Sequence, residues 1–356
     1  MKAVVLVGGE GTRLRPLTHA IPKPLLPIAN QPFLERQLTW LHRYGIDEVV
    51  LSLGYRPDAF AAHFSGDCFG DLQLRYAVED EPLGTAGAIR FAAEVGGIHE
   101  RFVVCNGDVL TTLDLGALIA FHDARGALAS IQLARVPDPS AFGVVPTYDD
   151  GEVREFVEKP PPGTAPTDWI NAGTYVLEPS VLERIPSGRN VSIERETFPG
   201  LLDARGQLYA LESDVYWLDI GTPDKYRAAH VDVVSGALGE PPVADAEERQ
   251  PGVWVQPGAV IDASTRLVPP VLIGRDTAVG PGVYLAATSV GDRCTVGYGV
   301  RIEGSVLLDG ATVERAAGVV DCVLGPDAVV AEAAQLRGEI VVAAHSSPST
   351  IMGRSV

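Results

Sequence analysis

The sequence is poor in basic residues, and in lysine most of all. It has 28 lysine and arginine residues against 46 aspartate and glutamate residues, which leaves a formal net charge of −18. Proteins that hold a nucleic-acid backbone show a basic patch, so this composition argues against general nucleic-acid binding. Any phosphate ligand would need local cations, and two of the four lysines, Lys23 and Lys159, stand in Lys-Pro pairs.

The sequence also lacks long apolar runs and closely paired cysteines. No stretch of about 18 apolar residues exists, so no membrane span is predicted. The cysteines have no C-x-x-C spacing, which favours reduced packing residues in a cytoplasm over metal ligands or disulfides. The N-terminus has a short apolar run that ends in glycines and no small-residue cleavage site, so we expect a first strand and not a signal peptide. The cysteines are Cys68, Cys105, Cys294 and Cys322.

Short apolar runs alternate with segments of helical spacing over residues 1–235. This alternation predicts βαβ units, and hence an α/β fold with a Rossmann-like, mostly parallel sheet and helices on both faces. Ligands of such sheets bind beyond the carboxyl ends of the strands. The expected strands are 3–7, 48–54, 72–78, 101–108 and 127–136, and the expected helices are 33–45, 85–95 and 115–126.

A different period begins after the linker. Aliphatic residues recur every six positions, with one slip of a single residue, and glycine often follows them. Such a hexapeptide repeat predicts a β-solenoid, in which aliphatic side chains stack inside a triangular coil. The pattern blurs after about residue 310, and Gly325 indicates one more turn. We expect domains at 1–235 and 253–356, joined by a Pro-, Gly- and acid-rich linker at 236–252. The repeat positions are Val255, Ile261, Leu267, Ile273, Val279, Leu285, Val290, Val296, Ile302 and Leu308.

The first predicted strand runs into the glycine-rich loop "VGGEGTR" (7–13). The loop matches neither G-x-x-x-x-G-K-[ST] nor G-x-G-x-x-G, so neither a P-loop nor a dinucleotide fingerprint is predicted. Gly8, Gly9 and Gly11 would let backbone N–H groups approach an anion closely. Arg13 could add a forked, charge-assisted contact. The alternative is a plain glycine-rich turn with solvent-facing arginines.

The remaining motifs of the first 235 residues resemble one enzyme family. In order they are "GGEGTRLRPLT" (8–18), "PKPLLPI" (22–28), "EPLGTAGA" (81–88), "NGDVL" (106–110), "FGVV" (142–145), "EFVEKP" (155–160), "INAGTYVLEP" (170–179), "SIERETFP" (192–199) and "WLDIGTPDKY" (217–226). This set resembles the sugar-1-phosphate nucleotidyltransferases, or NDP-sugar pyrophosphorylases. Within them it is most similar to mannose-1-phosphate guanylyltransferases, several of which carry a C-terminal left-handed β-helix.

The resemblance implies a reaction and its cofactor. The enzyme would join GTP and mannose 1-phosphate to give GDP-mannose and pyrophosphate, through Mg²⁺-assisted in-line attack of the sugar phosphate on the α-phosphorus. By the same resemblance Arg13 would bind the triphosphate, and Lys23 the phosphate near the reacting centre. Asp108 and Asp219 would hold Mg²⁺, which takes one or two carboxylates with phosphate oxygens and waters. Taken singly, either aspartate could instead be a helix cap or a turn residue.

On the sugar side, the resemblance implies that Lys159 holds the 1-phosphate. Glu158 and Asn171 would bond sugar hydroxyls, and the backbone of Gly143 would line the pocket, although Glu158 could otherwise be a surface strand residue. The lysines of the two Lys-Pro pairs, Lys23 and Lys159, would then bind the two phosphates that must meet in the reaction. The residues implied for the nucleotide are Leu6, Gly8, Gly9, Gly11, Thr12, Glu81, Gly84 and Thr85.

The choice of base depends on a carboxylate. In the related thymidylyl- and uridylyltransferases a glutamine typically reads the pyrimidine near this segment. A carboxylate such as Glu81 could accept from N1–H and N2–H of guanine, which favours GTP, unless Glu81 is a solvated loop residue. "NGD" stands where many guanylyltransferases have "NSD", a departure that leaves the base open and does not touch the role of Asp108. Mannose is implied by the resemblance alone.

Other functions are compatible with parts of this pattern. The same residues would serve a glucose-1-phosphate thymidylyl- or uridylyltransferase. A non-catalytic paralogue that senses nucleotide sugars would have lost catalytic groups that are all present here. An acyltransferase solenoid would need a catalytic histidine or an asparagine-rich acceptor site, and the C-terminal domain has only His345. We expect the solenoid to act instead as a scaffold, because its sheet edges and flat faces favour self-association into a homo-oligomer.

Overall fold

The computed structural model describes residues 1–54, 56–64 and 66–343 of the chain, and its contacts divide them into two compact units. The first unit comprises Met1–Thr12, Ile21–Leu26 and Pro32–Gly221; the second comprises Arg13–Ala20, Pro27–Gln31 and the described residues from Thr222 on. Helix α7 (Pro223–Val234) therefore groups with the C-terminal part. The domain boundaries at 235 and 252 stay a prediction, and His345 lies outside the described residues.

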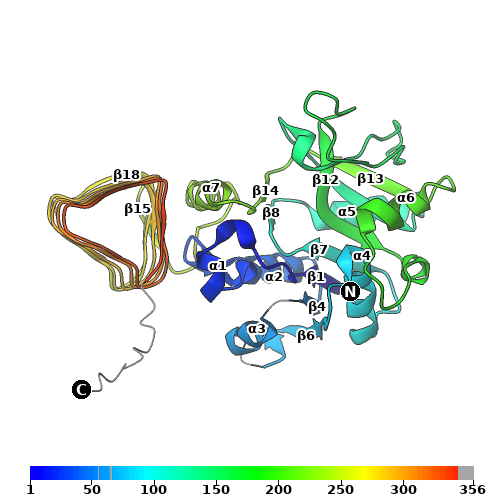
Figure 1. Ribbon diagram of the computed structural model, residues 1–356, viewed down its shortest axis with the longest axis horizontal. Helices are drawn as coiled ribbons and strands as arrows, with labels where there is room; N and C mark the ends of the chain where they lie inside the picture. The colour runs from blue at the N-terminus through cyan, green and yellow to red at the C-terminus, as the bar shows by residue number, and fades with distance from the viewer. Residues whose placement is uncertain (55, 65, 344–356) are drawn as a thin grey trace, which may run out of the picture. The chain divides into compact units, whose positions relative to one another are not determined.

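A ten-stranded mixed sheet forms the centre of the first unit (Figure 1). Its strands are β1 (Lys2–Leu6), β4 (Glu48–Leu53), β5 (Cys68–Phe69), β6 (Leu72–Val78), β7 (Phe102–Asn106), β9 (Ala129–Arg135), β10 (Gly143–Val144), β11 (Val157–Glu158), β12 (Trp169–Leu177) and β13 (Leu208–Ser213). The main path runs β11-β10-β12-β7-β1-β4-β6-β5, and β9 lies between β12 and β13. The central strands β7, β1, β4 and β6 are parallel, which confirms the predicted Rossmann-like core. Strand β12 runs antiparallel to both β7 and β9.

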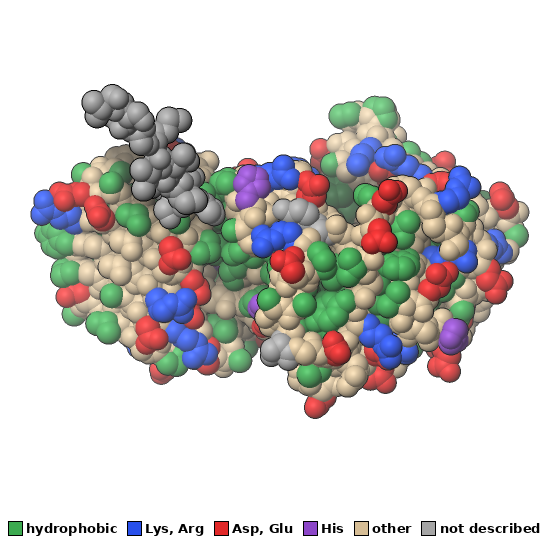
Figure 2. Space-filling view, turned by 60° about the horizontal axis from the view of Figure 1, so that its bottom comes forward, with side chains coloured by type: hydrophobic (Ala, Val, Ile, Leu, Met, Phe, Trp, Pro, Cys, Tyr) green, Lys and Arg blue, Asp and Glu red, His purple; other side chains and the backbone are tan. Residues whose placement is uncertain are grey.

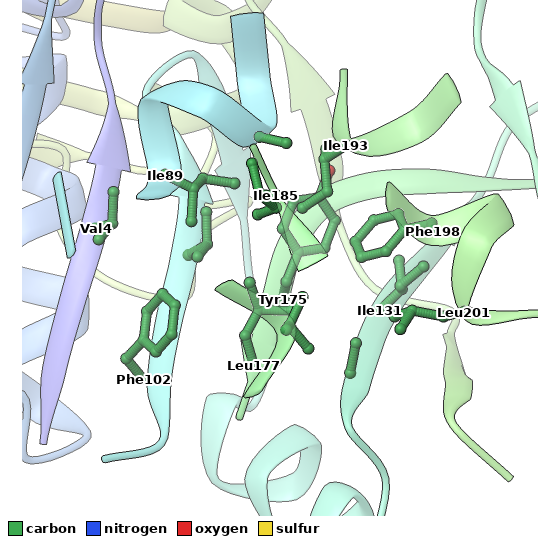
Figure 3. Packing of buried hydrophobic residues seen from close by; sticks show 14 of the residues in the cluster. Val4, Ile89, Phe102, Ile131, Tyr175, Leu177, Ile185, Ile193, Phe198 and Leu201 are labelled. Carbon is green, nitrogen blue, oxygen red and sulfur yellow. The ribbon is translucent and has the colours of Figure 1, made fainter. Parts of the chain in front are cut away.

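Helices cover both faces of this sheet, as predicted. They are α2 (Phe33–Arg43), α3 (Pro57–His63), α4 (Gly84–Val95), α5 (Leu115–Arg125) and α6 (Phe198–Leu201), with the short helices η2 (Lys23–Leu25), η3 (Pro139–Ala141), η4 (Pro179–Arg184) and the π-helix η5 (Ile193–Thr197). Alternate strand residues enter two separate cores. Val4 and Val104 pack under α4 and α6, whereas Val5 and Cys105 pack under α2, α3 and α5. Figure 3 shows the first core around Tyr175 and Phe198.

The sequence located these elements to within a few residues. The strand expected at 72–78 is β6 without change, and the helix expected at 33–45 ends two residues earlier, at Arg43. Two further short ladders complete the first part of the chain. They pair β8 (Val109–Thr111) with β14 (Trp217–Asp219), and β2 (Pro27–Ile28) with β3 (Gln31–Pro32).

The second unit contains the predicted β-solenoid, which Figure 1 shows end-on as a triangular coil. Parallel ladders connect corresponding sides of successive turns. Besides α1 (Leu17–Ala20) and α7, its elements are β15 (Glu247–Gln250), β16 (Val253–Val255), β17 (Val260–Ile261), β18 (Arg266–Ile273), β19 (Ala278–Val279), β20 (Tyr284–Val290), β21 (Thr295–Val296), β22 (Arg301–Glu303), β23 (Val306–Leu307), β24 (Thr312–Val313), β25 (Gly318–Val320), β26 (Val323–Leu324), β27 (Val329–Val330), β28 (Gln335–Arg337) and β29 (Ile340–Val341). The helix η1 (Thr12–Leu14) straddles the two units.

The register corrects two details of the predicted repeat. Val290 pairs with Leu307, so the interior stack on this side continues through Leu307 and not through Leu308. The coil also continues to β29, beyond the point where the six-residue period blurs, because valine and alanine still fill the interior positions there. Strand β15 lies inside the predicted linker and pairs antiparallel with β16, at the first turn of the coil.

The cysteine prediction is correct for three residues and wrong for one. Cys105, Cys294 and Cys322 are buried, whereas Cys68 is exposed, and none of the four is in a disulfide. Burial raises the pKa of the Cys105 thiol to about 12, so this thiol is held in its unreactive, protonated form. No helix among the residues that the structure describes is long and apolar enough to cross a membrane.

A buried histidine links α5 to the sheet. His122 is fully buried, with Nδ1 2.9 Å from the Ser130 hydroxyl and Nε2 3.3 Å from a Glu178 carboxylate oxygen. Glu178 also accepts from Arg101 at 2.7 Å. Burial lowers the pKa of His122, and the attraction of Glu178 only partly opposes this because Arg101 lies close by. The folded protein therefore holds His122 neutral more strongly than the unfolded chain does.

We predict that stability falls as pH is lowered through the unfolded histidine value of about 6.5, because the unfolded chain then binds a proton that the folded protein excludes. The loss should level off below the lowered pKa of folded His122. Urea unfolding of wild type and His122→Gln between about pH 8 and about pH 5.5 measures it. The free energy of unfolding of His122→Gln should depend less steeply on pH than that of wild type. His99→Gln, which changes an exposed histidine, should keep the wild-type pH dependence. Equal slopes for wild type and His122→Gln would contradict the prediction.

Candidate active site

The glycine loop leaves β1 at the carboxyl end of the sheet. Leu6 is the last residue of β1, and the N–H of Gly107, in the loop after β7, donates to its carbonyl at 2.9 Å. A Cβ on Gly107 would lie 2.7 Å from that carbonyl, so a serine here would require the backbone to shift. A Cβ on Gly8 would lie 3.1 Å from the backbone nitrogen of Gly54, whereas Gly9 has open space around it. Close backbone packing thus accounts for Gly8, and the structure leaves an open surface at Gly9.

The rest of the loop turns through Gly11, whose φ of 61° favours glycine. Thr12 and Arg13 follow in η1 and are exposed. Contacts group Arg13 with the second unit, in which Leu17 lies 3.2 Å from the Cβ position of Gly325.

Lys23 and Asp108 form the clearest charged pair of the site. Lys23 Nζ lies 2.6 Å from Asp108 Oδ2, and the lysine side chain is only 12% exposed. The β8–β14 ladder places Asp219 beside Val109, and the N–H of Ile220 donates to the Asp108 carbonyl at 2.9 Å. The two predicted metal ligands, 111 residues apart in sequence, therefore lie on adjacent backbones.

The predicted sugar-side residues also come together. Gly143 of β10 pairs with Glu158 of β11, and a Cβ on Gly143 would lie 3.1 Å from the Glu158 carboxylate. Glu158 Oε1 is 3.5 Å from Lys159 Nζ and 3.6 Å from a guanidinium nitrogen of Arg195. Glycine thus makes room for a carboxylate that faces two cations.

Asn171 is held by the backbone bulge of β12. Its Nδ2 donates to the Tyr175 hydroxyl at 2.9 Å, and its Oδ1 accepts from the N–H of Gly173 at 3.0 Å. Gly173 has φ 77°, and a Cβ there would collide with Asn106 of the "NGD" motif. The bulge therefore connects the predicted sugar ligand Asn171 to the loop that carries Asp108. The role of Asn171 toward a sugar stays a prediction.

The predicted nucleotide residues Gly84 and Thr85 begin α4. Gly84 has φ 69°, and its Cβ would lie 2.6 Å from the Val191 carbonyl. The Thr85 hydroxyl donates to Glu194 at 2.8 Å and accepts from the N–H of Ile193 at 2.8 Å. The structure thus shows the Thr85 hydroxyl engaged with the 191–194 segment, and its predicted contact with the nucleotide stays untested.

The loop before α4 is shaped by a residue that the sequence did not single out. Glu79 accepts from the Ser52 hydroxyl at 3.0 Å and from the N–H of Leu83 at 2.9 Å. Glu81, two residues on, is exposed. Glu79 therefore fixes the loop, and the predicted role of Glu81 toward a base stays untested. An acidic residue just after a strand was the available signal for Glu79.

The charges of the site are local. On the face in Figure 2, basic and acidic side chains lie next to one another and do not gather into one basic patch. Among the predicted site residues, cations meet carboxylates in two small clusters, Lys23 with Asp108 and Lys159 with Arg195 and Glu158. Arg195 is the second residue that sequence reasoning missed, because its motif "SIERETFP" supported the resemblance without a role for its individual residues.

Comparisons with known proteins identify relatives of this chain. A family profile described as nucleotidyl transferase matches residues 2–236. The mannose-1-phosphate guanylyltransferase of Mycobacterium tuberculosis is 41% identical over 310 residues, which is 86% of this chain and 82% of the relative. The UTP–glucose-1-phosphate uridylyltransferase of a Synechocystis species is 33% identical over 338 residues, 90% of this chain and 86% of the relative.

A solved structure is similar as well. The crystal structure of HddC from Yersinia pseudotuberculosis complexed with GMP-PN has a TM-score of 0.55 and 32% sequence identity, and the match covers 64% of this chain and 97% of HddC. The family match spans the whole sheet and every predicted site residue. The chain is therefore a member of the nucleotidyl transferase family.

Proposed function

We propose that this protein joins GTP and mannose 1-phosphate to form GDP-mannose and pyrophosphate. The pairing of two separate cation clusters with carboxylates supports this reaction, because each of two phosphate-bearing substrates needs its own positive charge. The names of the Mycobacterium relative and of the GMP-PN complex of HddC support guanine, and the first of these supports mannose. The Synechocystis relative makes transfer from UTP to glucose 1-phosphate the second candidate.

The chemistry is a displacement at phosphorus. An oxygen of the sugar phosphate attacks the α-phosphorus, the new P–O bond forms, and the bond to the β-phosphate oxygen breaks, so that pyrophosphate leaves with the electron pair. Phosphate monoesters are largely dianionic at neutral pH, since their second pKa is about 6, so the attacking oxygen needs no general base. The protein's residues therefore position the two substrates and stabilise negative charge. Lys159 holds the attacking phosphate, and Lys23 lies where charge develops.

Two aspartates fit a magnesium ion in this reaction. Asp108 and Asp219 lie on paired backbones, and the Asp108 side chain is 39% exposed. Among the described residues no cluster of three or more acidic, histidine or cysteine side chains forms a metal site, so the ion would take its other ligands from phosphate and water. When bound, Mg²⁺ would neutralise charge on the leaving pyrophosphate.

The base assignment depends on Glu81, whose exposed carboxylate is placed beyond the Glu79 anchor. It would accept from N1–H and N2–H of guanine, whereas uracil offers a single N3–H on that edge. A regulatory, non-catalytic function is the less favoured alternative, because Arg13, Lys23, Asp108, Lys159 and Asp219 are all present in the sequence. We further propose that the enzyme works in the cytoplasm.

We predict that Mg²⁺-dependent pyrophosphate release differs between substrate pairs when GTP, UTP, dTTP, ATP and CTP are crossed with mannose 1-phosphate and glucose 1-phosphate. Turnover should be highest with GTP and mannose 1-phosphate. Glu81→Ala should lower kcat/KM for GTP about 10-fold or more and change any UTP activity less, since a lost bidentate base contact costs about 1–3 kcal/mol. Preference for UTP or dTTP with glucose 1-phosphate would overturn the choice of base and sugar, and no turnover with any pair would overturn the catalytic proposal.

We predict that Asp108→Asn and Asp219→Asn each lose metal binding. Electron paramagnetic resonance of Mn²⁺ with the nucleotide present measures this directly, and kcat should fall roughly 100-fold or more, as for other losses of charge stabilisation. Asp203→Asn changes an exposed aspartate outside the site and should behave as wild type. Unchanged Mn²⁺ affinity in both site variants would show that the metal is held elsewhere.

We also propose that the solenoid mediates self-association. One of its sheets presents an uncharged row in register across five strands, in which Val260 is 70% and Val329 is 60% exposed. The members between them are Ala278, Thr295 and Thr312. On a chain of net charge −18, this row is a surface on which two copies can meet without repulsion.

Light scattering at micromolar concentration should therefore give a mass above that of one chain. Placing a charge in the row, by Val260→Arg with Val329→Arg, should lower that mass. A monomer mass for wild type would refute the proposal, and an unchanged oligomer in the double variant would place the interface elsewhere.

A further inference from the structure

The π-helical turn η5 lies between the predicted nucleotide side and the predicted sugar side of the site. Its N-cap Ser192 accepts from the N–H of Arg195 at 3.2 Å, and the N–H of Ser192 donates to Glu196 at 3.0 Å. This reciprocal capping holds a turn of a kind that is rare in proteins and frequent at functional sites. None of its residues has a role in the function proposed above.

On one side the turn presents Arg195 to the predicted sugar-side residues. Its guanidinium is 3.6 Å from Glu158 Oε1, the same oxygen that lies 3.5 Å from Lys159 Nζ. Both cations are largely exposed, at 65% for Arg195 and 60% for Lys159, so both can turn toward an incoming ligand. One carboxylate oxygen cannot neutralise two cations, and the cluster carries a net positive charge. A phosphate dianion would complete it, and the planar guanidinium can bind two phosphate oxygens at once.

On the other side the turn is tied to the start of α4. Glu194 Oε2 accepts from the Thr85 hydroxyl and from the Ser192 hydroxyl, both at 2.8 Å. The N–H of Ala86 donates to the Val191 carbonyl, and the N–H of Val191 donates to the Leu83 carbonyl, both at 2.9 Å. The loop that carries the predicted nucleotide residues and the turn that carries Arg195 therefore form one connected piece of structure.

The turn is also anchored in the core, so its backbone has little freedom. Ile193 at its start and Phe198 just after its end are fully buried. Figure 3 shows both pointing into the cluster around Tyr175, whose ring centroid is 5.1 Å from that of Phe198. A rigid backbone with an exposed guanidinium keeps the charge in a defined region and leaves the end of the arginine side chain free to adjust.

We propose that Arg195 is the second cation that, together with Lys159, binds the phosphate of the sugar 1-phosphate, and that Glu194 is a positioning residue that holds the Arg195 turn against the nucleotide loop. This inference rests on the proposed function, because it takes the ligand of the Glu158 cluster to be a sugar phosphate. It assigns the turn a purpose beyond packing, which is to couple the geometry of the two substrate sites.

Arg195→Ala should raise KM for the sugar 1-phosphate about 10- to 100-fold, since a hydrogen bond to a charged group contributes about 1.5–3 kcal/mol. KM for the nucleotide should change less than about 3-fold. Arg195→Lys should recover part of the loss, because it keeps the charge and loses the fork. Arg154→Ala removes an exposed arginine that lies over Tyr148 in the same unit and should leave both constants unchanged.

Glu194→Gln tests the positioning role. It should raise KM for the sugar 1-phosphate in wild type and have almost no further effect in the Arg195→Ala background, because it acts through Arg195. A merely structural effect would instead lower stability and shift the constants for both substrates in both backgrounds. Unchanged KM for the sugar 1-phosphate in Arg195→Ala, or full additivity of the two changes, would overturn the respective assignment.

Direct binding separates this inference from the proposed reaction. Calorimetric titration with mannose 1-phosphate and with glucose 1-phosphate, without nucleotide, measures sugar-phosphate affinity whether or not turnover occurs. Weaker binding of either probe in both Arg195→Ala and Lys159→Ala supports the role of Arg195 even if the expected GDP-sugar is not formed. Weaker binding in Lys159→Ala alone overturns it, and so does a wild-type protein that binds neither probe.

Discussion

Two polyanions must meet on a chain whose own charge is −18, and this repulsion is the constraint on which the site depends. The protein does not offset this repulsion with a generally basic composition. Each cation is instead placed against a carboxylate, one-to-one in the pair Lys23–Asp108 and two-to-one where Lys159 and Arg195 share Glu158, which leaves only a small local excess of positive charge. In the function proposed above, a phosphate would take the place of the carboxylate as the partner of these cations. The positive field is short-ranged, which suits recognition of small phosphates over long nucleic acids.

Backbone contacts bring these pairs together from distant parts of the chain. The loops after β1 and β7 meet through the hydrogen bond between Gly107 and Leu6, and β14 joins them through its ladder with β8. Gly107 and Gly173 are needed because a Cβ at either would meet Leu6 or Asn106. Glycine in this site therefore serves close packing of one loop against another at least as much as approach to a ligand. This also explains the "NGD" form of the motif in physical terms, without reference to the base that is bound.

The sequence was informative where side-chain periodicity alone determines structure. Strand β6 alternates and α2 has helical spacing, so both could be located, and the aliphatic repeat revealed the coil because each inward position needs a branched side chain. The repeat misplaced the stack at Leu308 because Leu308 keeps the six-residue spacing from Ile302, whereas the coil slips by one residue there and pairs Leu307 with Val290. The turn 193–197 has no periodic signature. Its shape depends on hydrogen bonds to Thr85, more than 100 residues away, and no local pattern contains that information.

The two cation clusters differ in burial, and this difference fits the different roles proposed for them. Lys23 is 12% exposed, so its ammonium is held in one place beside Asp108, and this would suit the proposed role of Lys23 where charge develops, because reorganisation there would slow the reaction. Lys159 and Arg195 are largely exposed on a fixed backbone, so their side chains can adjust as a sugar phosphate enters. The contact of Thr85 with Glu194 ties the helix that begins at Gly84 to the turn that carries Arg195, so this adaptable cluster rests on the same piece of structure as the predicted nucleotide residues Gly84 and Thr85.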